Sequence, residues 1–290
     1  MAARKIMIST PAYGEVFYTP YVSSILRLTR TLQKRGWDFA FNAISYSEIA
    51  ESRNFLLTHW FDKTDASHLL FVDADMGYGP ELITDMIDLD KPVVGAVYPK
   101  RTIDMTRVAQ FAAEGKTDGK PAAEDAARAV AKAQDFVLRP LRNARTTASR
   151  PGFIEVEACG SGILLIQRGC IEAMLKKFPE LSDAKAKTTS PLAKNLDRLI
   201  RAFDVLFVDG LRLSEDFSFC HRWRRQCGGE VWASITHEIA HIGLHQFRAR
   251  YIDKVAGSSQ VVVKRGEQTV VTGRLAPRTQ TQTKGRPTKH

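Results

Sequence analysis

Long apolar runs and closely spaced cysteine pairs are both missing from this sequence. No apolar run approaches the length that crosses a bilayer, and the first residues, Met-Ala-Ala-Arg-Lys, lead into a predicted strand instead of the apolar region of a signal peptide. The 4 cysteines form no CxxC pair and no spacing typical of a disulfide framework. These absences argue against a membrane-spanning protein and a disulfide-stabilised secreted domain. We expect a cytoplasmic protein with no membrane span and with reduced, structural thiols.

Net positive charge is small over most of the chain and concentrated at its end. The net charge is +10, but residues 254–290 alone hold eight Lys or Arg and one Glu, which leaves only +3 for the rest. The body is therefore not expected to read nucleic acid. Residues 251–290, rich in Thr, Gln, Gly and Pro, are predicted to form a flexible basic tail. Such a tail either contacts an anionic partner, such as nucleic acid or lipid headgroups, or is simply solvated.

The first hundred residues alternate between predicted strands and helices. Strands are expected at 5–9, 38–44, 69–72 and 92–97, and helices at 20–34, from Ser47 to 61, and from Pro80. This order is typical of a mostly parallel sheet flanked by helices, an α/β fold. With 290 residues, the chain is long enough for one large α/β domain or two smaller ones.

Residues 102–150 interrupt this alternation. An Ala-rich helix begins near Pro121, with Ala126, Val130, Ala133 and Val137 at helical spacing, and we expect a helical insertion on one side of the core. After it, strands at 153–158 and 163–167, a helix at 171–177, a loop at 182–194 and a last ordered block at 211–251 are predicted.

Two carboxylates follow one of the predicted buried strands. The run Leu69-Leu-Phe-Val72 is apolar throughout, and Asp73 and Asp75 come directly after it. Open α/β sheets bind ligands at the carboxyl ends of their strands. Carboxylates there are suited to hold Mg²⁺ or Mn²⁺ together with substrate phosphates. The alternative is that both acids only cap the helix that begins near Pro80.

A second acidic pair, Glu215 and Asp216, opens another predicted helix. Ser214 is a reasonable N-cap, and acids are favourable at the positive end of a helix dipole. An acid pair at a helix start beside a metal site is also a plausible general base. The sequence leaves both interpretations open.

The segment His237-Glu238-Ile-Ala-His241 matches the zinc-protease pattern of two histidines one helical turn apart with a glutamate base. The residues before it are strand-like, Gly243 follows too soon for a firm helix, and His245 does not have the spacing of the extended motif. The alternative is that one histidine, His241, reaches a cation held near Asp75.

In this order, four short motifs resemble the nucleotide-sugar glycosyltransferases of the GT-A fold, in particular family 2-like enzymes. They are Ser-Arg-Asn at 52–54, Val-Asp-Ala-Asp at 72–75, Ser-Glu-Asp at 214–216 and His-Ile-Gly at 241–243. The resemblance extends from about residue 5 to residue 247 and omits the insertion and the tail. It implies a GT-A-like domain at 1–250, with a nucleotide-binding half at 1–101, the insertion at 102–150 and an acceptor and metal half at 151–250.

The resemblance also implies donor-site roles. Asp75, with Asp73 and His241, would hold Mn²⁺ or Mg²⁺ at the diphosphate of a nucleoside-diphosphate sugar, and Asp73 would also contact the ribose or sugar. Arg53 would reach the nucleotide or the diphosphate. The loop of Thr10, Pro11 and Tyr13 would cradle the base.

For the chemical step, the resemblance implies that Asp216 deprotonates a hydroxyl acceptor for inverting transfer, with Glu215 as its rival. Gly160-Ser-Gly162 would let a strand approach the donor sugar, or would simply form a tight turn. Processive members carry a Gln-x-x-Arg-Trp motif and membrane helices. Here Arg222-Trp223 lies too close to Asp216, so we expect a non-processive enzyme.

Two other functions remain open on the sequence alone. One is a zinc-dependent hydrolase that uses His237, Glu238 and His241. The other is a non-catalytic binding protein that uses the basic tail on an anionic partner.

Overall fold

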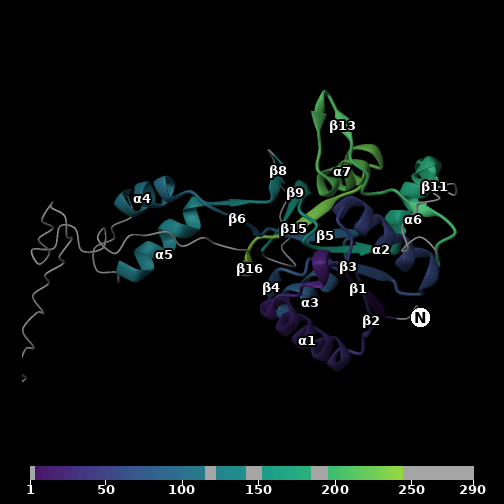
Figure 1. Cartoon of the computed structure of the whole chain (residues 1–290), viewed down its shortest axis with the longest axis horizontal. Coiled ribbons are helices and arrows are strands. Elements are labelled where there is room, and N and C mark those ends of the chain that lie inside the picture. The colour runs from purple at the N-terminus through teal and green to yellow at the C-terminus, as the bar shows by residue number, and fades with distance from the viewer. Residues whose placement is uncertain (1–3, 115–121, 142–151, 184–194, 244–290) are drawn as a thin grey trace, which may run out of the picture. The chain divides into compact units, whose positions relative to one another are not determined.

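The computed structural model describes residues 4–114, 122–141, 152–183 and 195–243 (Figure 1). Residues Met1–Gly243 cluster as one compact unit. The predicted basic tail and most of the predicted loop at 182–194 lie outside the described residues. Within the described part of the chain, no helix has both the length and the apolar composition needed to span a membrane.

A mixed sheet of eight strands in the described residues forms the centre of the fold, in the order β2-β1-β3-β10-β5-β15-β9-β8. β1 is parallel to β2 and β3, and β15 is parallel to β5. β10 lies between β3 and β5 and is antiparallel to both, and β9 is antiparallel to β15 and β8. Six of these strands (β2, β1, β3, β5, β15 and β8) therefore point one way and β10 and β9 point the other way. This arrangement confirms the predicted α/β class. The strands are β1 (Lys5–Pro11), β2 (Asp38–Ile44), β3 (His68–Val72), β5 (Val93–Ala96), β8 (Leu138–Pro140), β9 (Phe153–Cys159), β10 (Ile163–Gln167) and β15 (Val231–Ser234).

Helices cover both faces of this sheet (Figure 1). α1 (Thr19–Lys34) and α3 (Pro80–Leu89) pack on one face, where Ile6, Ile8, Leu70 and Val72 point. α2 (Ile49–Lys63), α6 (Arg168–Lys177) and α7 (Glu215–His221) pack on the other, against Met7, Leu69 and Phe71 among others. Successive strand residues thus enter opposite cores, as the period of two requires. Each fully buried large apolar side chain stabilises the fold by about 1.5–3 kcal/mol.

Several short elements complete the described fold. β4 (Met76–Tyr78) pairs with β16 (Ile239–His241), β11 (Ser182–Asp183) with β12 (Leu199–Ile200), and β13 (Phe207–Val208) with β14 (Leu211–Arg212), all antiparallel. The short helical turns are η1 (Tyr13–Glu15), η2 (Pro179–Leu181) and the π-helical η4 (Arg222–Gln226).

The predicted insertion is a helical hairpin on a two-stranded ribbon. β6 (Pro99–Ile103) pairs with β7 (Gln134–Phe136), and between them α4 (Met105–Glu114) and α5 (Ala122–Ala133) pack against each other. The predicted apolar stripe is correct only at Ala133, which is buried. Ala126 and Val130 are exposed, and Val137 lies beyond the end of α5. Ala129, one residue before Val130, is buried instead. The ribbon begins directly after β5 and Tyr98, so its first strand leaves the sheet at the edge where β3 also ends.

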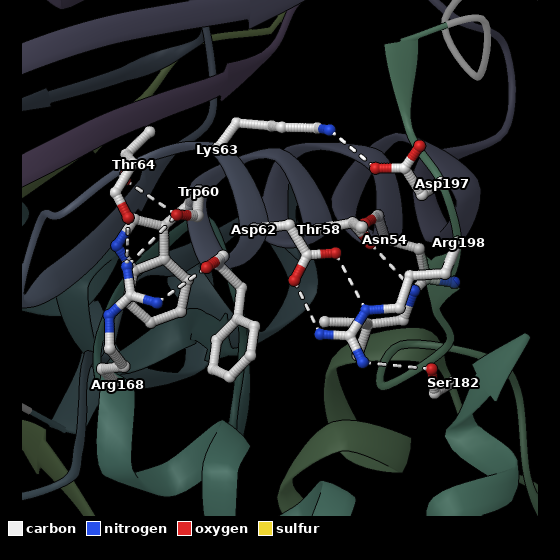
Figure 2. Close-up of polar contacts among 12 residues, drawn as sticks. Asn54, Thr58, Trp60, Asp62, Lys63, Thr64, Arg168, Ser182, Asp197 and Arg198 are labelled. Atoms are coloured by element: carbon white, nitrogen blue, oxygen red, sulfur yellow. Dashed lines mark hydrogen bonds and ion pairs between the residues drawn. The ribbon is translucent and has the colours of Figure 1, made fainter. Parts of the chain in front are cut away.

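Two arginines hold the outer side of α2 in place (Figure 2). Arg168 donates to the carbonyl oxygens of Phe61 at 2.7 Å, Thr64 at 2.8 Å and Ala66 at 3.1 Å. It therefore satisfies carbonyl groups that the end of a helix leaves without partners. Arg198 makes a bidentate pair with Asp62 at 2.6 and 2.8 Å. The position of α2 matters because this helix also carries Arg53.

We expect Arg168→Ala to lower the free energy of unfolding by about 2–3 kcal/mol, because several half-buried carbonyl groups lose a charged donor at once. Arg198→Ala is the matched control, because Arg198 also contacts α2, through Asp62. Its pair with Asp62 is partly exposed, so the expected loss is at most about 1 kcal/mol. Urea unfolding of the three proteins measures both values. Equal losses in the two variants would contradict the assignment of Arg168 as the main support of α2.

Candidate active site

The carboxyl end of β3 is fixed by backbone contacts with the turn between β9 and β10. The Asp73 amide donates to the Gly162 carbonyl oxygen at 2.8 Å, and the Met76 amide donates to the Asp73 carbonyl oxygen at 3.1 Å. The two glycines of this turn leave space for the Tyr98 side chain. A Cβ at Gly160 or Gly162 would lie 2.0 or 2.9 Å from the Tyr98 hydroxyl oxygen. This turn therefore lets Tyr98 pack beneath it, and it needs glycine at both positions.

β16 brings His241 to Asp75. β16 pairs with β4, and the Ile242 amide donates to the Asp75 carbonyl oxygen at 2.9 Å. The His241 Nε2 atom lies 3.4 Å from Asp75 Oδ2, while Nδ1 lies 2.7 Å from the Pro99 carbonyl oxygen. Since a carbonyl oxygen only accepts, Nδ1 carries a proton, and Nε2 is the nitrogen directed to the carboxylate. Burial opposes the charged form of His241, but the contacts with Asp75 and Pro99 outweigh it and raise the pKa of His241.

Arg53 joins the two acidic segments. Its side chain is 3% exposed, and Nη2 lies 3.0 Å from Asp73 Oδ1 and 3.1 Å from Oδ2. Its Nε atom lies 3.6 Å from Glu215 Oε1, and Nη1 donates to the Ser161 carbonyl oxygen at 3.2 Å. The end of β3 and the start of α7 are thus held together by one buried guanidinium. Arg53 is not among the residues that line the neighbouring pocket, so it is placed to position Asp73 and Glu215.

Burial dominates the ionisation of Asp73. It raises the pKa of Asp73 to about 6, and the negative charges of Asp75 and Glu215 add to the rise, while Arg53 opposes it. A carboxylate that is costly to ionise in this way is stabilised by any further positive charge that arrives beside it. Perturbed carboxyl groups of this kind are typical of functional sites.

Asp216 lies at the start of α7 and is 9% exposed. Its Oδ1 atom accepts from the Phe217 amide at 2.7 Å and from the Ser214 hydroxyl. Ser214 occupies the predicted N-cap position, but its hydroxyl bonds to Asp216 and makes no cap hydrogen bond. Burial and the charge of Glu215 raise the pKa of Asp216. Because both contacts use Oδ1, Oδ2 is the oxygen that would accept a proton.

A pocket of about 480 Å³ lies beside the two aspartates. Tyr13 stands on its wall and is 75% exposed, a position from which a ring can stack on a flat ligand. Thr10 is fully buried instead, with its hydroxyl 2.5 Å from that of Tyr21, so it fixes the end of β1 against α1. The lining residues are Pro11, Tyr13, Val16, Tyr18, Ile49, Asp73, Ala74, Asp75 and Arg101.

The donor atoms at Asp75 fit a divalent cation whose coordination is completed by a ligand. Asp75 Oδ1 is buried and has no hydrogen-bond partner among the described residues. The same part of the chain contains no group of three His, Cys, Asp or Glu arranged to hold a metal. Protein sites for Mg²⁺ often supply only one or two carboxylates and leave the rest to phosphate and water. Asp75 and His241 fit that type of site. The described residues do not provide the full set of protein ligands that a closed structural metal site needs.

The zinc-protease pattern does not form a helix. His237 lies in the loop before β16, where Nδ1 is 2.8 Å from Ser234 Oγ and Nε2 is 3.2 Å from Asp85 Oδ2. His241 lies on β16 and faces Asp75. The two histidines therefore have separate partners. A strand also lacks the one-turn spacing on which the zinc pattern depends.

Sequence reasoning missed Arg101. Its Nη1 atom lies 3.0 Å from Asp75 Oδ2, and it lines the pocket. Tyr98 was also missed: its hydroxyl accepts from the Gly162 amide at 3.1 Å, and its ring contacts His241 edge-on at 5.4 Å. Neither residue belongs to a recognisable motif. The one available signal was their position just after the predicted strand at 92–97, at the same sheet edge as Asp73.

No protein-family model matches the sequence, and no curated protein matches it either. Solved structures with a similar fold include A197 from STIV, at 14% identity and a TM-score of 0.40 over 85% of this chain and 98% of that chain. Another is a Drosophila β-1,4-galactosyltransferase 7 mutant in complex with manganese, UDP-Gal and xylobiose, at 12% identity and a TM-score of 0.38 over 92% and 82%. A third is the inositol-1-phosphate CTP transferase from T. maritima, at 8% identity and a TM-score of 0.37 over 83% and 90%.

A glycosyltransferase, the class that the motifs resemble, and a CTP transferase are thus among the solved structures with a similar fold. At these identities the likeness concerns the fold alone.

Proposed function

We propose that this protein is a metal-dependent glycosyltransferase that moves a sugar from a nucleoside-diphosphate sugar to a hydroxyl acceptor, with inversion and without processivity. The observation that carries the proposal is the buried, unpartnered Asp75 Oδ1 beside a pocket that also exposes the Tyr13 ring. A nucleotide needs both a flat apolar surface for its base and a positive centre for its phosphates. The pocket offers the first, and Asp75 with His241 would hold the second.

In this proposal, each residue of the site has a task that suits its surroundings. Asp75 and His241 would hold Mn²⁺ or Mg²⁺, which neutralises charge on the departing nucleoside diphosphate when bound. Asp73 would orient the ribose or the sugar, since Arg53 fixes its carboxylate from below. Pro11 and Tyr13 would contact the base, and Thr10 would support them from beneath.

Asp216 is the better candidate for the general base. Glu215 is paired with Arg53 at 3.6 Å, whereas Asp216 keeps Oδ2 outside its two hydrogen bonds. A raised pKa makes a carboxylate a stronger proton acceptor near neutral pH. Asp216 would take the proton of the acceptor hydroxyl as that oxygen attacks the anomeric carbon.

A thermal-shift panel of UDP, GDP, CMP and dTDP, each with and without Mn²⁺, tests the proposal. One nucleotide should stabilise the protein only with the metal. At a hundredfold excess over its dissociation constant the gain is about 2.7 kcal/mol. For a domain of this size, that gain corresponds to a rise in melting temperature of about 5–10 °C. If no nucleotide shifts the melt while Zn²⁺ alone does, the transferase proposal fails and the hydrolase alternative gains support.

We expect Asp216→Asn to leave Mn²⁺-dependent nucleotide binding intact and to lower kcat by about 10²–10⁴-fold, because an amide accepts no proton. Glu215→Gln is the matched control and should retain transfer. Since Glu215 raises the pKa of Asp216, its neutralisation should move the acidic limb of the kcat/KM profile to lower pH. Normal turnover in Asp216→Asn, or loss of turnover only in Glu215→Gln, would assign the base elsewhere.

A further inference from the structure

Arg101 shares Asp75 with His241. Its Nη1 atom lies 3.0 Å from Asp75 Oδ2, the oxygen that also lies 3.4 Å from His241 Nε2. The Asp75 side chain is 17% exposed and that of Arg101 is 53% exposed. The carboxylate is therefore largely buried, whereas the Arg101 side chain is half exposed beside the pocket that it lines.

The aliphatic part of the Arg101 side chain lies against Gly243. A Cβ at Gly243 would lie 2.9 Å from Arg101 Cδ and 3.3 Å from its Cγ, so glycine lets the Arg101 side chain take this position without a shift. The segment that brings His241 to Asp75 thus also accommodates Arg101.

A cation bound to Asp75 would compete with the Arg101 guanidinium for the Asp75 carboxylate. A cation held by both Asp75 and His241 would lie near the Arg101 guanidinium, because His241 and Arg101 approach the same oxygen, Asp75 Oδ2. Like charges a few ångström apart repel each other. A displaced guanidinium stays tethered to β6 at the rim of the pocket that Arg101 lines. Phosphate oxygens are the ligands that its planar fork binds best, often through two hydrogen bonds.

We propose, on the basis of the proposed function, that Arg101 exchanges partners when the donor binds. In the free protein, Arg101 neutralises Asp75 and weakens cation binding. With the donor, the cation takes its place on Asp75, and Arg101 binds the diphosphate. This exchange couples the two ligands, since each one favours the arrangement that the other needs.

Arg101→Gln separates the two roles because it should change two affinities in opposite directions. Mn²⁺ alone, titrated by the EPR signal of the free ion, should bind about three- to tenfold more tightly, since a competitor for Asp75 is gone. Pyrophosphate in the presence of Mn²⁺, followed by calorimetry, should bind about tenfold more weakly. A merely structural ion pair would not produce this reversal. Arg101→Lys, which keeps the charge, should lie closer to the wild type in both measurements.

Lys100→Gln is the matched control. It removes the same charge from the neighbouring, exposed position of β6, and both affinities should change by less than about twofold. The proposal is overturned if Arg101→Gln binds Mn²⁺ no more tightly than the wild type, if its pyrophosphate affinity is unchanged, or if neither protein binds Mn²⁺. Both expected results, combined with failure of every nucleotide in the thermal-shift panel, would instead reject sugar transfer and retain a cation and diphosphate site built on Arg101.

Discussion

Asp75→Ala is expected to abolish the stabilisation of this protein by nucleotide and Mn²⁺, a loss of about 2.7 kcal/mol at a hundredfold ligand excess. The reason is that Asp75 Oδ1 is buried and has no hydrogen-bond partner among the described residues, while Oδ2 lies 3.4 Å from His241 Nε2. His241 alone is a poor anchor for a hard cation, which prefers oxygen ligands. Transfer should fall by at least about a thousandfold, since the departing diphosphate loses its counter-charge. Thermal shift and the release of nucleoside diphosphate measure the two effects.

Asp65→Asn is a suitable control for this experiment. Asp65 is an exposed acid that pairs with Lys5 just before β3 begins, at the opposite end of the strand from Asp73. Its neutralisation removes the same charge and should alter neither nucleotide binding nor transfer. A nucleotide response that survives in Asp75→Ala would move the cation, or the whole donor site, to another part of the molecule.

Arg53→Met is expected to be the most destabilising of these substitutions, at about 3–4 kcal/mol. The variant keeps most of the buried volume but leaves Asp73 and Glu215 without their shared cation, and a buried charge that loses its partner is costly. For a domain of this size, the melting temperature should fall by about 6–15 °C. Chemical denaturation in EDTA measures the effect without interference from bound metal.

The double variant Arg53→Met with Asp73→Asn shows whether the cost arises from the uncompensated carboxylate. Removing the charge of Asp73 should restore at least about 1 kcal/mol relative to Arg53→Met alone, because the two residues are in direct contact. Strictly additive losses would mean that Arg53 supports α2 by packing alone, for example through its contact with the Phe71 ring.

Much of the fold was predictable from local patterns. The strand at Asp38–Ile44 has the predicted bounds, and α1 begins one residue before the predicted start. The place of β10 was not predictable. Its apolar residues indicate a buried strand, but its antiparallel insertion between β3 and β5 depends on contacts between residues more than 60 positions apart. The N-cap of α2 also lies one residue later than expected, at Glu48 in place of Ser47.

The site was predictable where it coincides with motifs. The resemblance implied that Asp75 and His241 hold one cation together. The two side chains lie 3.4 Å apart, and their role as metal ligands stays a prediction. Arg53 and Thr10 show the limit of such reasoning. Motifs give the identity of a residue but not its burial, and both side chains are buried beneath the pocket they were expected to line. Arg101 lies outside every motif, since its role depends on the space that Gly243 leaves.

Because β4 pairs with β16, which is far later in the sequence, the surroundings of Asp75 cannot be complete until most of the described chain has been synthesised. Asp75 leaves the ribosome 166 residues before His241, which corresponds to roughly 10–30 s at common translation rates. Throughout that interval, the growing chain carries Asp73 and Asp75 without the strand that completes their surroundings. A chain that stops before Ile239 has no β16 to add to β4. The contact between His241 and Asp75 can therefore form only after β16 has been synthesised. In the proposed function, a prematurely terminated chain would lack His241 as the second residue that holds the cation.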